Sequence, residues 1–140
     1  MSFEERHTWA GTAIGLAAII AYVVVIAGRA RDAALTDLAW GWPMLVTVLI
    51  AGGLYGLVYL GLRLRHRGEP IADARDIEID RYAELAGKGL VSATVTAAIV
   101  MLALNVDTFW VAHTLFAGAY LSSLVVTLTK LAVYRSGLPS

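Results

Sequence analysis

The chain has 140 residues, of which 59% are hydrophobic and 16% are charged, and its mean hydropathy is +0.70. A soluble domain typically contains about 45–50% apolar and about 25% charged residues, so this composition excludes an ordinary soluble protein and indicates a membrane protein. The net charge is zero, and the absence of cysteine excludes disulfides, dithiol redox chemistry and thiolate metal sites.

Four apolar runs follow one another along the chain, at residues 9–28, 38–62, 85–104 and 109–129. Each run is close to the ~20 residues that an α-helix needs to cross a bilayer, and Lys88 is the only Asp, Glu, Lys or Arg residue within them. The segment ahead of the first run carries two acidic residues and one arginine, so it lacks the basic start of a secretory signal. We therefore expect the first run to be a retained helix.

The connections between the runs predict how the helices pair. Residues 105–108 allow only a tight turn, so the third and fourth runs should form an antiparallel hairpin, and residues 29–37 pair the first two runs in the same way. Pro43 falls in the first turn of the second helix, where its missing N–H costs little. The predicted fold is all-α: an integral membrane bundle of four transmembrane helices, made of two antiparallel hairpins in a single domain, 1–140.

A charged connector, residues 63–84, joins the two hairpins. Gly68 and Pro70 end the second helix, and the apolar spacing that follows predicts an amphipathic helix running directly into the third span, so the third helix should extend into the cytoplasm. Carboxylates on one side of this extension suit a solvated, salt-bridged face, a docking surface for a cytoplasmic partner, or a divalent-cation site. They are Asp73, Asp76, Asp80 and Glu84.

The basic residues predict the orientation. With four spans, the termini and the connector lie on one side of the membrane, and nine of the eleven Lys and Arg residues fall on that side. The positive-inside rule therefore predicts cytoplasmic termini and a cytoplasmic connector. Arg63, Arg65 and Arg67 form a juxtamembrane cluster with His66 that should contact anionic lipid headgroups, the alternative being a specific lipid or regulator site.

Small residues recur at four-residue spacing in every run. Such stripes let helix backbones approach closely in membranes, although glycine and alanine are also frequent in membrane helices without forming interfaces. We expect these residues to pack helices within a bundle or between copies of the chain. They are Gly11 and Gly15; Gly52 and Gly56; Gly89, Ala93 and Ala97; and Thr114, Gly118 and Ser122.

A candidate polar site lies at the start of the fourth run, where His113 follows Asn105 and Asp107. Ionisable groups within a membrane are functional candidates by default. His113 lies only about 6 Å inside the run, at 1.5 Å per residue, where water reaches it. We expect an interfacial or interhelical hydrogen bond, with a proton, ligand or metal site as the alternatives.

Several functional classes lack the residues that they require. No acidic residue lies in the middle of a run, as a proton-coupled multidrug exporter requires, and His7 and His66 are both predicted on the cytoplasmic side, which disfavours a bis-histidine haem. No Ser/His/Asp arrangement, H-E-x-x-H motif or glycine-rich phosphate loop occurs. We expect no enzyme activity, cofactor, metal centre or nucleic-acid partner.

The second half contains three characteristic segments, DARDIEIDRYAELAG, NVDTFWVAHTLFAGAYLSSLV and KLAVYRSGLP, and the chain begins MSFEERHTW. Their most specific features are the Asp-x-Arg-Asp-x-Glu-Ile run at residues 73–79, the pair Phe109 and Trp110, and the ending Tyr134 and Arg135. Together they resemble a bacterial family of small four-helix membrane proteins whose shared domain has no assigned function. The resemblance implies the four-helix fold and a bacterial cytoplasmic membrane.

The leading functional expectation is a non-enzymatic bundle that acts through helix contacts, as a homo-oligomer or as an accessory subunit of a larger membrane complex. One alternative is a small oligomeric channel or transporter lined by Ser and Thr hydroxyls, which can also bond within their own helices. A second alternative is a membrane sensor that signals to a cytoplasmic regulator through the carboxylate face.

Overall fold

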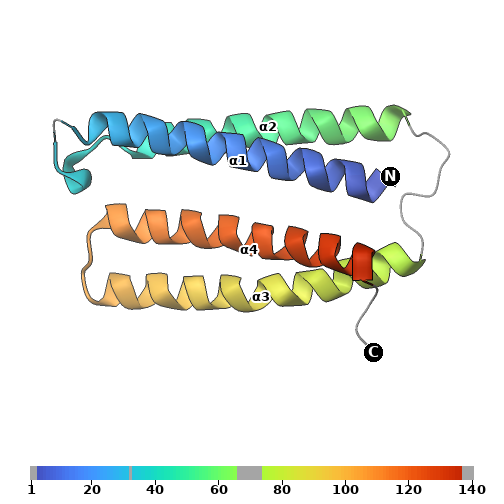
Figure 1. Cartoon of the computed structure of the whole chain (residues 1–140). Helices are drawn as coiled ribbons and strands as arrows, with labels where there is room; N and C mark the ends of the chain where they lie inside the picture. Colours follow the sequence, from blue (N-terminus) through green and yellow to red (C-terminus); the bar gives the residue numbers. More distant parts are fainter. Residues whose placement is uncertain (1–2, 32, 66–73, 137–140) are drawn as a thin grey trace. The chain divides into compact units, whose positions relative to one another are not determined.

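The computed structural model describes residues 3–31, 33–65 and 74–136, and over these ranges its regular structure is entirely helical. The prediction of an all-α chain is confirmed. In chain order the elements are α1 (Phe3–Arg29), the short 3-10 helix η1 (Leu35–Asp37), α2 (Gly41–Arg65), α3 (Ala74–Ala103) and α4 (Thr108–Ser136) (Figure 1).

The four α-helices are each long and apolar enough to cross a membrane. Their candidate spans contain 24, 25, 30 and 28 residues in chain order. A span needs about 20 residues, so each helix exceeds the minimum. The four apolar runs found in the sequence therefore correspond to α1, α2, α3 and α4.

The chain divides into two compact units, Met1–Glu69 and Pro70–Ser140. In the first unit α1 packs against α2, and in the second unit α3 packs against α4 (Figure 1). Each unit therefore has its own interface between two helices.

An irregular segment joins α1 to α2. It contains a 3-10 turn followed by extended backbone at Leu38 (ψ 140°), so α2 begins at Gly41 and not at residue 38 as expected. The Arg29 guanidinium donates a hydrogen bond of 2.7 Å to the carbonyl oxygen of Ala39 and so ties the end of α1 to the start of α2. Pro43 lies in the first turn of α2, where its fixed φ suits a helix start.

The turn between α3 and α4 depends on Asn105, whose φ of 53° lies in the left-handed region that asparagine enters more readily than most residues. The Asn105 N–H bonds to the carbonyl oxygen of Leu102 at 3.0 Å, and the Val106 N–H bonds to that of Met101 at 2.9 Å. These two bonds form a Schellman motif, which satisfies carbonyl groups at the end of a helix.

α3 is one continuous helix of 30 residues. Its first part is the predicted amphipathic extension, which runs into the apolar span without a break. Ile79 and Ala83 in this part are fully buried. The extension is therefore packed on one side and is not surrounded by solvent.

Candidate functional site

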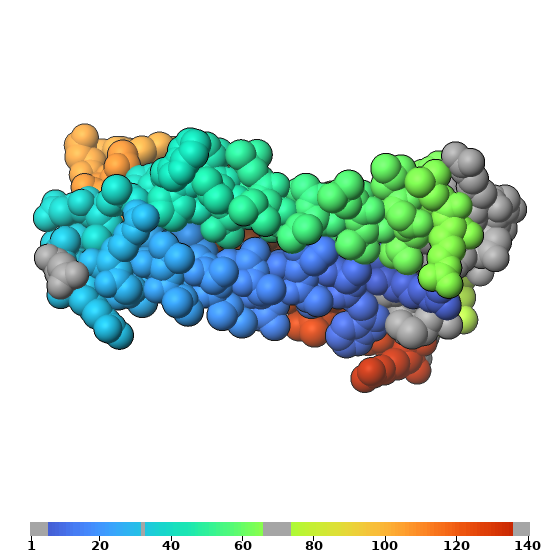
Figure 2. Space-filling model, turned by 90° about the horizontal axis from the view of Figure 1, so that it is seen from above, coloured from blue at the N-terminus to red at the C-terminus, as the bar shows by residue number. Residues whose placement is uncertain are grey.

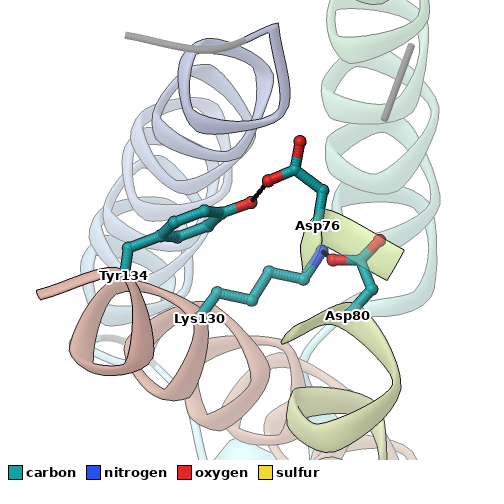
Figure 3. A network of polar contacts seen from close by, with 4 residues as sticks. All are labelled: Asp76, Asp80, Lys130 and Tyr134. Carbon is teal, nitrogen blue, oxygen red and sulfur yellow. Dashed lines mark hydrogen bonds and ion pairs between the residues drawn. The ribbon is translucent and has the colours of Figure 1, made fainter. Parts of the chain in front are cut away.

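A network of four polar side chains joins the start of α3 to the end of α4 (Figure 3). Nζ of Lys130 lies 2.5 Å from Oδ1 of Asp80, and the Tyr134 hydroxyl donates a hydrogen bond of 2.7 Å to Oδ1 of Asp76. The Lys130 side chain is 14% exposed and the Asp80 side chain 36% exposed. Partial burial strengthens the attraction within this pair relative to a fully solvated one, so the network fixes the two helix ends to each other.

The network continues a regular line of contacts between α3 and α4. The contacting residues of α4 are four or eight residues apart, and those of α3 are seven residues apart with a last step of four, so the α3 set stays on one helix face whereas the α4 set turns gradually around its helix. The pairs are Thr114 with Met101, Gly118 with Thr94, Ser122 with Gly87, Lys130 with Asp80 and Tyr134 with Asp76.

Two glycines allow the close approach of α3 and α4. A Cβ atom at Gly87 would lie 2.5 Å from Cγ2 of Val126 and 3.0 Å from Oγ of Ser122, and one at Gly118 would overlap the side chain of Thr94. The buried Ser122 hydroxyl donates a hydrogen bond of 3.0 Å to the carbonyl oxygen of Gly87. Small residues and interhelical hydrogen bonds are the contacts that hold helices together in membranes.

The carboxylates that were expected to share one exposed face of the α3 extension differ in their surroundings. Asp76 and Asp80 are engaged with α4, whereas Glu84 lies 3.8 Å from Lys88 in an exposed ion pair along α3. Asp73 lies outside the described residues. Asp80 lies seven residues before Gly87 and therefore on the face of α3 that meets α4. Glu84 lies to one side of this face, so it does not reach α4. Over the described part of the chain, no group of three or more His, Asp or Glu residues could hold a metal ion.

The residues of the candidate polar site each have a local role near the α3–α4 turn. Nδ1 of His113 lies 2.6 Å from the carbonyl oxygen of Phe109, within α4, and the two rings stack with centroids 3.9 Å apart. Oδ1 of Asp107 accepts a hydrogen bond of 2.7 Å from the Phe109 N–H and thereby caps α4. Asn105 holds the left-handed turn position. The structure thus gives Asn105 a role in the turn, Asp107 a role in capping α4, and His113 a contact with Phe109 within the same helix.

Two of the glycines predicted to pack helices meet a side chain of the neighbouring helix. Gly118 meets Thr94, and a Cβ atom at Gly11 would lie 2.9 Å from Cε2 of Tyr55. Gly15 is half-buried. The close approach predicted at Gly11 therefore occurs against an aromatic ring and not against a helix backbone.

Other predicted packing residues are open. Beyond their chain neighbours and the nearby backbone of their own helix, the Cβ positions of Gly52, Gly56 and Gly89 have no described heavy atom within 4 Å, and Ala93 is exposed. On α3 the face that meets α4 is that of Gly87, about 200° around the helix from Gly89. The four-residue spacing from Gly89 thus selected a face that does not contact α4. Contact of the open glycines with another molecule stays a prediction.

The predicted headgroup cluster is described in part. Arg63 and Arg65 are exposed in the last turn of α2, and no described residue forms an ion pair with them. Arg67 lies outside the described residues. Within the part of the chain that the structure describes, the two guanidinium groups thus have no carboxylate partner.

An apolar groove of about 300 Å³ lies between α1 and α2, which run side by side in Figure 2. Ala17 and Ala21 of α1 and Val46 and Ala51 of α2 are among its lining residues. None of the lining residues is charged, so the groove suits an apolar chain and not an ionic ligand.

Several threonine hydroxyls bond within their own helices. Each donates to the carbonyl oxygen four residues earlier at 2.8–2.9 Å: Thr12 to Thr8, Thr47 to Pro43, Thr94 to Leu90 and Thr96 to Ser92. Such a bond satisfies the hydroxyl without a second helix or a solute. These four side chains therefore do not form a row of free hydroxyls along a polar pathway.

The candidate site is described from the contacts between α3 and α4, and comparison with known proteins adds no further residues to it. No protein-family model, curated protein or solved structure matches the chain.

Proposed function

We propose that the chain is a multi-pass protein of the bacterial cytoplasmic membrane, with both termini in the cytoplasm and the two helix pairs, as hairpins, in one bundle. The length and hydropathy of the four helices support insertion, and so do large apolar side chains in open positions, such as Val24 (65% exposed) and Leu57 (69% exposed). The positive-inside bias supports the orientation. Membership in the bacterial family of four-helix proteins, which the sequence led us to expect, is part of the same proposal.

Within the membrane, the proposed role is non-enzymatic and depends on helix contacts, as a homo-oligomer or as an accessory subunit of a larger complex. The observation that carries this proposal is the open glycine face of α2, formed by Gly52, Gly53 and Gly56. α2 has no buried residue, and, beyond their chain neighbours and the nearby backbone of α2 itself, no described heavy atom lies within 4 Å of the Cβ positions of these glycines. Gly52 and Gly56 are one turn apart, so a second helix could approach the α2 backbone closely.

The α3–α4 pair supports the same role, because in this pair small residues on each helix accommodate side chains of the other helix. There, Gly87 and Gly118 receive side chains of the opposite helix. The glycine face of α2 has equivalent small residues without such side chains. In this proposal a helix from a second copy or from another subunit, and not α3 or α4 of the same chain, fills this space.

The first test is co-purification of two differently tagged copies from one membrane. Gly52→Leu with Gly56→Leu should reduce the second tag severalfold, because two large side chains would block the close approach. Gly61→Leu is the matched control, since Gly61 is equally open but lies about 180° around α2 from Gly52. A protein that is strictly monomeric in native mass spectra and retains no other membrane protein would contradict the proposal.

Two observations favour helix contacts over the alternative roles. The threonine hydroxyls bonded within their own helices weaken the case for a hydroxyl-lined channel or transporter. Engagement of Asp76 and Asp80 with α4 removes two carboxylates from the surface through which a sensor would signal. Ion or proton flux in liposomes that is lost in His113→Ala would instead support the channel.

A further inference from the structure

We draw no further inference here: the strongest candidate, the apolar groove of about 300 Å³ between α1 and α2, carries no proposal because its lining residues are uncharged and nothing in the structure shows what covers it.

Discussion

The hydroxyl of Ser122 on α4 donates a hydrogen bond of 3.0 Å to the carbonyl oxygen of Gly87 on α3. Ser122 is 6% exposed, and the absence of a side chain at Gly87 leaves it room, because a Cβ atom there would lie 3.3 Å from the Ser122 carbonyl oxygen. In sequence the contact falls between the polar network and the α3–α4 turn. The hydrogen bond therefore connects α3 and α4 near the middle of their length. Its acceptor is a backbone carbonyl, which a side-chain substitution does not remove.

Gly87→Ala should destabilise the α3–α4 pair by about 1–3 kcal/mol, the usual cost of overpacking a close contact. The added methyl would meet Val126 and the Ser122 backbone. Gly89→Ala is the control: it has open space and should be neutral or stabilising by up to about 1 kcal/mol, since alanine favours helix. Unfolding in mixed detergent micelles measures both. Equal effects of the two substitutions would contradict the packing described here.

Asp80→Asn should destabilise the protein more than Lys130→Met does. Asp80→Asn leaves the less exposed member of the pair, Lys130, without a counter-charge, whereas Lys130→Met leaves the more exposed carboxylate. The expected losses are about 1–3 kcal/mol for the first substitution and about 1 kcal/mol for the second. A double-mutant cycle followed by unfolding gives the coupling, and additive losses would show that the ion pair contributes nothing.

Asn105→Gly should be close to neutral, and Asn105→Val should cost at least about 1 kcal/mol, because a β-branched residue resists a positive φ. Both substitutions remove the same amide side chain. A difference between them in the unfolding free energy therefore reports the backbone conformation of the turn. If both variants lose the same stability, the amide side chain and not the left-handed backbone explains the asparagine.

The sequence was sufficient to predict the helices because apolar runs of this length leave few other structures. It also predicted that the α3 extension continues into the apolar span. The start of α2 was missed by three residues: residues 38–40 are as apolar as the helix after them, and only the extended backbone at Leu38 separates them. Hydropathy does not distinguish an extended apolar segment from a helical one.

Of the two small-residue stripes predicted on α3 and α4, the one on α4 lies at the α3–α4 interface and the one on α3 does not. The four-residue spacing of Thr114, Gly118 and Ser122 identified the correct face of α4, but the same rule on α3 selected Gly89 and its open face. On α3 the contacts recur every seven residues, at Gly87 and Thr94. A search for small residues at four-residue spacing does not detect that pattern, although a heptad search starting from Asp80 would.

The most direct test of the central proposal is photo-crosslinking from α2 in native membranes. A benzophenone attached at Leu49→Cys lies on the glycine face of α2, and one at Leu54→Cys lies about 140° away, with exposures of 64% and 50% at the two positions. The proposal predicts a protein adduct of higher mass from Leu49→Cys and much less of it from Leu54→Cys. Lipid adducts alone from Leu49→Cys, or equal protein adducts from both positions, would contradict it.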